Sequence, residues 1–287
     1  MNDESGQMRV RLLGPLSAHL GEGDIAPSAA KQRQILALLA LNGGRVVTVG
    51  TLVEELWGDY PPRSFSTTLQ TYVLQLRNRL AAAAAGGSRA RELLSTRHGG
   101  YMLEEAACQT DVDEFGRLSL AGRAAAEKGD YRAASEQFGR ALELWRGPAL
   151  VDVRLGRVLE LEATSLEETR LGALERRIEA DLALGRHADV LGELSLLVAR
   201  NPMNENFCGL LMTALYRSGH VGRALGEYQR VRAVLSDELG IEPCPSLRRL
   251  QQAILSGDPA LESGLSAKRA NTRAETARIE SPFRASA

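Results

Sequence analysis

Residues suited to covalent or metal-based chemistry are scarce in this sequence. Its 287 residues include three cysteines and four histidines, and neither a CxxC nor an HExxH spacing occurs. An odd number of widely separated cysteines argues against a disulfide framework and favours a reducing compartment. The sequence also contains no GxSxG and no GxxxxGK[ST] motif, the signatures of many hydrolases and of P-loop ATPases. We therefore expect no catalytic residue, no metal site and no cofactor, and a protein that is not an enzyme.

Long hydrophobic runs are absent as well. No apolar stretch approaches the ~18–20 residues that a membrane-spanning helix needs, and the opening MNDESGQMRVRLLG lacks the apolar core of a secretory signal. With 44% hydrophobic and 25% charged residues, the composition is typical of soluble globular proteins. We expect a cytoplasmic protein without a membrane partner, long enough for two domains.

An overall excess of basic residues is also missing, because the formal net charge is −1. The charge is nevertheless unevenly distributed. Residues 8–104 contain 11 Lys+Arg against 7 Asp+Glu, a net charge of +4, whereas residues 105–260 contain 19 against 24, a net charge of −5. A basic first segment beside an acidic second one indicates an anionic partner for the first, although +4 is common in ordinary domains.

Residues 8–104 have the pattern of a small domain with strands on both sides of three helices. Apolar periodicity predicts strands at 8–14 and 16–20, helices at 29–41, 49–57 and 64–84, and hairpin strands at 93–96 and 101–104. Asn42-Gly43-Gly44 is a strong end signal for the first helix, and Thr48 can cap the second.

The third helix of this segment has an unusual outer face. One side is apolar, with Phe65, Leu69, Tyr72, Leu76 and Leu80. The opposite side has hydroxyl, amide and apolar side chains: Thr67, Gln70, Thr71, Leu74, Gln75 and Asn78. Amides and hydroxyls suit base edges in a major groove. Arg77 and Arg79 flank this face, where phosphates would lie.

The hairpin that follows has a cationic tip. Its turn is Arg97-His98-Gly99-Gly100. A hairpin after three helices is typical of a wing, and a cationic tip can enter a narrow minor groove. Arg97 and His98 are the candidate contacts, although His98 also fits an ordinary solvated turn.

Residues 110–257 follow a helical pattern with internal repeats. The aligned segments are EKGDYRAASEQFGRALELW, ALGRHADVLGELSLLVARNP and RSGHVGRALGEYQRVRAVL, with turn glycines at Gly129, Gly185 and Gly219. The last two glycines are 34 residues apart, the tetratricopeptide period. Each glycine is followed after five residues by a small or branched residue and after nine by a large one: Ala134 and Phe138, Val190 and Leu194, Ala224 and Tyr228. Such repeats bury their apolar faces by stacking on one another.

Both halves resemble one protein family. Residues 8–104 resemble the OmpR-type winged helix of the Streptomyces antibiotic regulatory proteins. The strings that carry this resemblance are RLLGPL, KQRQILALLALNGGRVVTVGTLVEELWGDYPP, TTLQTYVLQLRNRL and LLSTRHGGYML. The second half resembles the bacterial transcriptional activator domain, a tetratricopeptide-like bundle. The strings that carry this resemblance are DVDEF, ALELWRGPALVDV and YQRVRAVLSDELGIEPCPSLRRLQQAIL. Nothing resembles the ATPase domain of larger members, so the resemblance is to the small form.

The resemblance implies that the third helix enters the major groove and that the hairpin tip touches the neighbouring minor groove. It places Thr67, Thr68, Gln70, Thr71, Leu74 and Gln75 near bases and Arg77 at a phosphate. Family members often have histidine, a small polar residue and arginine where this chain has Tyr72, Leu74 and Gln75. Leu74 can instead meet a thymine methyl group.

The expected fold is mainly α: a winged helix-turn-helix with small β-sheets, followed by an all-α tetratricopeptide-like repeat domain. Expected domain ranges are a disordered 1–7, a winged helix at 8–104, an activator domain at 110–257 and a disordered tail at 258–287. The resemblance implies a transcriptional activator of a secondary-metabolite (antibiotic) gene cluster that is cytoplasmic and nucleoid-associated. It implies a homodimer on direct repeats of double-stranded promoter DNA, which recruits RNA polymerase through contacts that include the sigma factor.

A peptide-binding scaffold is the alternative function. Tetratricopeptide arrays often bind peptides, and winged helices sometimes serve only as protein contacts. A pure scaffold would not need Arg77, Arg79 and Arg97 around a polar helix face, which favours DNA binding.

Overall fold

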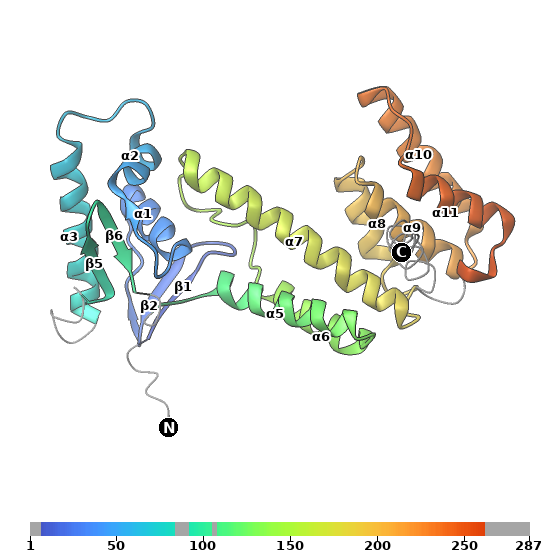
Figure 1. Cartoon of the computed structure of the whole chain (residues 1–287), viewed down its shortest axis with the longest axis horizontal. Helices are drawn as coiled ribbons and strands as arrows, with labels where there is room; N and C mark the ends of the chain where they lie inside the picture. Colours follow the sequence, from blue (N-terminus) through green and yellow to red (C-terminus); the bar gives the residue numbers. More distant parts are fainter. Residues whose placement is uncertain (1–6, 84–91, 105–107, 262–287) are drawn as a thin grey trace, which may run out of the picture. The chain divides into compact units, whose positions relative to one another are not determined.

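The computed structural model describes residues 7–83, 92–104 and 108–261, and it is mainly helical with two small sheets near the N-terminus (Figure 1). The predicted fold class is therefore confirmed. The predicted loop at 85–91, and almost all of the ends predicted to be disordered (1–7 and 258–287), lie outside the described residues. Contacts within the chain define two compact units, one made of residues 1–121 and 137–173, the other of residues 122–136 and 174–287.

The first unit begins with a four-stranded sheet of order β3-β2-β1-β7. Its strands are β1 (Met8–Arg11), β2 (Ser17–Leu20), β3 (Gly23–Asp24) and β7 (Cys108–Thr110). β1 is antiparallel to β2 and parallel to β7. Met8 and Val10 are buried and the two arginines between and after them are exposed, as the alternating sequence predicts. The strand predicted to reach residue 14 ends at Arg11.

The three predicted helices and the hairpin follow. Helices α1 (Ala30–Leu41), α2 (Val49–Trp57) and α3 (Phe65–Ala83) stand beside a sheet of order β4-β6-β5, formed by β4 (Val47–Thr48), β5 (Leu94–Arg97) and β6 (Gly100–Leu103) (Figure 1). Thr48 caps α2, because its Oγ1 accepts a hydrogen bond from the Thr51 N–H at 3.1 Å. This cap was expected from the sequence.

The buried face of α3 differs slightly from the predicted one. Leu69, Val73, Leu76 and Leu80 are buried in the core of the first unit. Phe65 and Tyr72, which were expected on this face, are only half-buried. The spacing of the four buried residues is four, three and four, so the helix turns its apolar stripe one position towards Val73. The hydroxyl- and amide-bearing face stays outward.

Two family-like strings that are far apart in the sequence, RLLGPL and WRGPALVDV, meet in the first unit. The Arg146 N–H donates to the Leu13 carbonyl at 2.9 Å, and the Leu150 N–H donates to the Leu12 carbonyl at 3.0 Å. The buried carboxylate of Asp111 accepts hydrogen bonds from the N–H groups of the same two leucines, at 2.7 and 3.1 Å. Residues 104 and 110 thus both lie in the first compact unit, which runs to residue 121 and resumes at residue 137.

Glu55 makes a second connection of this kind. It lies in α2 and is only 2% exposed. Its Oε1 accepts from the Gly156 N–H at 2.6 Å and its Oε2 from the Leu159 N–H at 2.9 Å, at the start of α7 (Arg157–Ala183). A carboxylate at a helix N-terminus satisfies N–H groups that have no partner within the helix. Glu55 thereby fixes α2 to the beginning of α7.

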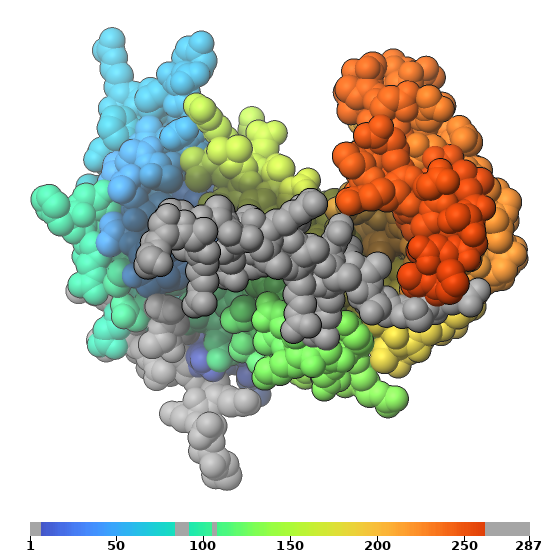
Figure 2. All heavy atoms as spheres, turned by 45° about the vertical axis from the view of Figure 1, so that its right-hand side comes forward, coloured from blue at the N-terminus to red at the C-terminus, as the bar shows by residue number. Residues whose placement is uncertain are grey.

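The remaining helices carry the repeats. Three helices contribute to both units: α5 (Asp111–Glu127), α6 (Tyr131–Glu143) and α7. The second unit also contains α8 (Leu191–Arg200), α9 (Glu205–Arg217), α10 (Val221–Leu239), α11 (Pro245–Ser256) and the short turn η3 (Pro259–Leu261). Helices α10 and α11 lie together (orange and red in Figure 2). None of the helices in the described ranges is long and apolar enough to cross a membrane.

The repeat pattern predicted from the sequence is present in the helices. Gly129, Gly185 and Gly219 share a φ of +79°, a backbone conformation that favours glycine, and each ends the turn after a helix. The six residues expected to pack between helices are all buried: Ala134, Phe138, Val190, Leu194, Ala224 and Tyr228. The middle repeat departs from the pattern, because α8 begins six residues after its glycine, whereas α6 and α10 begin two residues after theirs.

Candidate nucleic-acid interface

The outer face of α3 is exposed along its length. Leu69, Val73 and Leu76 anchor the helix in the core, so the residues on the opposite face point outward. Of the six residues expected near bases, Thr68 is half-buried and the other five are exposed: Thr67, Gln70, Thr71, Leu74 and Gln75. Leu74 is 57% exposed, so its side chain is available for contact with a partner.

The threonines of this face use their hydroxyl protons within the helix. Thr68 Oγ1 donates to the Ser64 carbonyl at 3.0 Å, and Thr71 Oγ1 donates to the Thr67 carbonyl at 2.9 Å. A hydroxyl that has donated its proton can still accept a hydrogen bond. In this arrangement both threonines offer an acceptor oxygen and a methyl group, which suit an exocyclic amino group and a thymine methyl respectively.

The two glutamines of this face differ. The amide oxygen of Gln75 accepts a hydrogen bond from Nε2 of Gln32, which lies in α1 and is 7% exposed. The amide nitrogen of Gln75 has no such partner among the described residues, and its oxygen keeps one lone pair. Gln70 is exposed and has no hydrogen bond to any residue in the described ranges, so both its donor and its acceptor are available. A bidentate contact to adenine needs both groups, and Gln70 offers both without a partner among those residues, whereas the side chain of Gln75 is held by Gln32.

Arg77 does not extend freely beside this face. Its Nε donates to the Leu94 carbonyl at 2.9 Å and its Nη2 to Thr96 Oγ1 at 2.8 Å, both in β5. Its guanidinium carbon lies 6.0 Å from the centre of the Tyr101 ring in β6. The residue is half-buried and its guanidinium is held by the hairpin, with three further N–H donors left by these contacts; the phosphate contact implied by the resemblance stays a prediction. Arg79, in contrast, is exposed.

The tip of the hairpin is exposed and cationic. Arg97 pairs with Gly100 in the ladder between β5 and β6, which leaves His98 and Gly99 as the turn. The Arg97 guanidinium lies 4.0 Å from the Glu104 carboxylate, and the Arg97 side chain is 52% exposed. An exposed ion pair this long contributes little and does not restrain the arginine. Arg97 and His98 can both reach a partner beyond the tip.

Glycine is required where the hairpin meets β4. A Cβ atom at Gly100 would lie 2.1 Å from the Val47 carbonyl oxygen, so no side chain fits. Gly99 has a φ of +79°. These two glycines let β6 approach β4 closely and turn the chain at the tip, which explains the HGGY string physically.

Several residues that position the interface were not identified from the sequence. Gln32 holds Gln75, and Thr96 with Tyr101 holds Arg77. All of these contacts join segments that are distant in the sequence, so no local pattern marks them. Within the described residues, no group of three or more His, Cys, Asp or Glu side chains could hold a metal ion.

Sequence comparisons match both halves of the chain to known families. Residues 26–103 match the model described as transcriptional regulatory protein, C terminal, and residues 110–255 match the bacterial transcriptional activator domain. The chain is 48% identical to the regulatory protein DnrI of Streptomyces peucetius over 89% of this chain and 94% of that protein. The chain belongs to the Streptomyces antibiotic regulatory protein family.

Further relatives of this antibiotic regulatory protein support the assignment. It is 40% identical to the transcriptional regulator RedD of Streptomyces coelicolor, over 90% of this chain and 73% of RedD. The solved structure of Mycobacterium tuberculosis EmbR in complex with a low-affinity phosphopeptide matches it with a TM-score of 0.83 and 35% identity, over 95% of this chain and 70% of EmbR. The chain is thus a transcriptional regulator, and its first unit contains the winged helix of the family.

Proposed function

We propose that this regulator activates a secondary-metabolite (antibiotic) biosynthetic gene cluster by binding direct repeats in promoter DNA. It acts in the cytoplasm, at the nucleoid, as a homodimer on DNA and recruits RNA polymerase through contacts that include the sigma factor. The observation that carries the proposal is the exposed face of α3, which offers amide, hydroxyl and apolar groups beside a cationic hairpin tip. That combination fits a major groove and the minor groove next to it.

The residues of the interface divide into three roles. Gln70, Thr71 and Leu74 read base edges, with Thr67, Thr68 and the free amide nitrogen of Gln75 beside them. Arg79, Arg97 and His98 face phosphates or the minor groove. Arg77 acts indirectly, since its contacts to Leu94 and Thr96 set the position of the hairpin against α3.

The experiment that tests this proposal is a footprint of the purified chain on promoters of its neighbouring gene cluster at two salt concentrations. Protection of two half-sites about 10–11 base pairs apart, weakening as salt rises, is expected. Transcription from the same promoter with purified RNA polymerase would then separate activation from repression. Absence of protection at low salt would contradict the proposal and favour a peptide-binding scaffold.

A further inference from the structure

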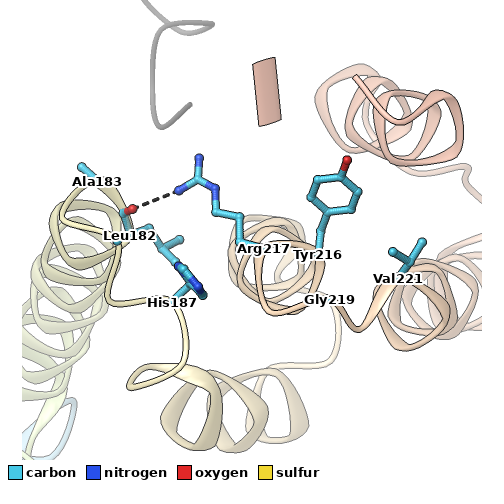
Figure 3. Close-up of a pocket in the computed structure, with 8 residues that line it drawn as sticks. Leu182, Ala183, His187, Tyr216, Arg217, Gly219 and Val221 are labelled. Atoms are coloured by element: carbon cyan, nitrogen blue, oxygen red, sulfur yellow. Dashed lines mark hydrogen bonds between the residues drawn. The ribbon is translucent and has the colours of Figure 1, made fainter. Parts of the chain in front are cut away.

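A cavity opens in the second unit at the turns that follow α7 and α9 (Figure 3). Its volume of about 530 Å³ is in the range of small-molecule sites. Its lining includes the end of α7 (Leu182, Ala183) with His187 beyond it, and the end of α9 (Tyr216, Arg217) with Val221 at the start of α10. None of these residues belongs to the proposed DNA interface.

The cavity coincides with the irregular middle repeat. Helix α8 begins at Leu191, four residues later than the start of α6 or α10 relative to its turn glycine. His187 lies in the turn that replaces the first helical residues. In a repeat with the spacing of the other two, His187 would already be the first helical residue.

Arg217 is the principal polar group of the cavity. Its Nη1 donates to the Leu182 carbonyl at 2.9 Å (Figure 3). Its Nε donates to the Leu261 carbonyl at 2.7 Å. A guanidinium has five N–H donors, so three remain. Arg217 is half-buried, and no carboxylate of the described residues forms an ion pair with it. Burial lowers the pKa of Arg217 because its charge is taken out of water without an anion beside it.

The other walls suit the rest of an anionic ligand. Nδ1 of His187 is buried and has no hydrogen-bond partner within the described part of the chain. The Tyr216 hydroxyl extends from α9 on the same side as Arg217 (Figure 3). Leu182 and Val221 supply apolar surface. A cation with three unused donors, two further polar groups and apolar walls fits a ligand that has one anionic group and a hydrophobic body.

We propose that this cavity binds a small organic carboxylate, whose anionic group pairs with Arg217 and whose apolar body packs against Leu182 and Val221. Such a site gives the regulator a small-molecule input that is separate from its DNA-binding surface. The proposal does not depend on the proposed function, because every residue that it uses lies in the second unit.

Calorimetric titration of the full chain with 3-phenylpropionate, and with 3-phenylpropanamide as its neutral counterpart, tests the proposal. We expect the carboxylate to bind saturably at one site and at least about tenfold more tightly than the amide, because only the carboxylate offers a charge to Arg217. R217Q should weaken carboxylate binding at least about tenfold while keeping a donor for the Leu182 carbonyl. R223Q removes an exposed arginine from the first turn of α10, outside the cavity, and should change nothing.

The proposal is overturned if the amide binds as well as the carboxylate, if a folded R217Q binds like the parent chain, or if no saturable binding occurs up to about 10 mM. Should R217Q fail to fold, Y216F replaces it, since it removes one hydroxyl only. We expect a severalfold loss with Y216F, and unchanged binding would contradict the site.

The carboxylate could be free or could come from the chain itself. Leu261, whose carbonyl Arg217 holds, is the last described residue, and Glu262, Glu275 and Glu280 follow it. A full-length chain with these three residues changed to glutamine distinguishes the sources. At least about fivefold tighter binding of 3-phenylpropionate would identify these glutamates as competing occupants, and equal binding would show that none of the three occupies the site.

Discussion

At the scale of single residues, two arginines of α3 that look equivalent in the sequence have different surroundings. Arg77 is half-buried and donates to Leu94 and Thr96 of β5, whereas Arg79 is exposed. The sequence predicts phosphate contacts for both, because both flank the polar face. The partners of Arg77 are a backbone carbonyl and a hydroxyl on a distant strand, which periodicity along α3 cannot indicate.

Salt dependence separates the roles of these two arginines. R79A should lower the slope of log affinity against log salt by about 1, because one phosphate contact is lost. R77A should weaken binding to specific and random DNA by about 1–2 kcal/mol, since two hydrogen bonds that hold the hairpin are lost, and leave the slope unchanged. Fluorescence anisotropy at several salt concentrations measures both. Equal slope changes for R77A and R79A would show that Arg77 reaches a phosphate.

Base reading should concentrate on Gln70. Q70A is expected to cost about 1–3 kcal/mol on the specific site and little on random DNA, because a bidentate contact discriminates between bases. Q75A is the matched control, since its amide oxygen already binds Gln32, and it should cost less. Competition binding assays with specific and random duplexes measure both. Equal losses on the two DNAs would remove Gln70 from the base-reading set.

The cysteines should differ in reactivity. Burial raises the pKa values of Cys108 and Cys208 to about 12, while Cys244 is partly exposed. The thiolate is the reactive form, so at about pH 8 the two buried thiols hold only about one part in 10⁴ as thiolate. A disulfide reagent should modify one thiol rapidly in the native chain and three after denaturation. C244S should abolish the rapid phase, and its persistence would contradict the assignment.

At the scale of elements, periodicity and end signals predicted most of the first unit. Helix α3 was expected at 64–84 and spans Phe65–Ala83, and the Thr48 cap is present. Local rules succeed here because capping and amphipathicity act within a few residues. The predicted strand at 8–14 was too long, since Leu12 and Leu13 bond to Asp111 and to the segment after Trp145 instead of continuing the ladder. The strand β7 was not predicted, because its partner is about a hundred residues away.

The contact between β6 and β4 gives a prediction for the hairpin as an element. G100A should lower the free energy of unfolding by at least about 1–3 kcal/mol, because its Cβ would collide with the Val47 carbonyl. G116A is the matched control. Gly116 is exposed within α5 with open space around it, so alanine there should stabilise by about 0.5–1 kcal/mol. Chemical denaturation measures both changes, and a neutral G100A would mean that β4 and β6 separate easily.

At the scale of the whole molecule, the family matches and the contacts divide the chain differently. The family model that matches the first half ends at residue 103, and the one that matches the second half begins at residue 110, close to the predicted boundary. The first compact unit nevertheless includes β7 and residues 137–173. The ends of the family matches are set by similarity of sequence. The limits of the compact units are set by burial and by hydrogen bonds such as those of Glu55 and Asp111.

A comparison of fragments tests this division. The sequence alone predicts that residues 1–104 fold by themselves. The contacts of Glu55 with Gly156 and Leu159, and of Asp111 with Leu12 and Leu13, instead predict that a 1–173 fragment unfolds cooperatively. The 1–104 fragment should melt at least about 10 °C lower or without a clear transition. Equal melting temperatures of the two fragments, measured by circular dichroism, would show that residues 1–104 fold without the later segment.

The return of the chain to its first unit also has a consequence for synthesis on the ribosome. The bond from the Leu159 N–H to Glu55 closes a loop of 104 residues, so it cannot form until that residue has left the exit tunnel. Long-range contacts of this kind slow folding and leave intermediates exposed. A nascent chain truncated by premature termination inside the winged helix or shortly after it would therefore lack the partners of Glu55. Such products would be substrates for chaperones and proteases rather than free DNA-binding fragments that compete for the operator.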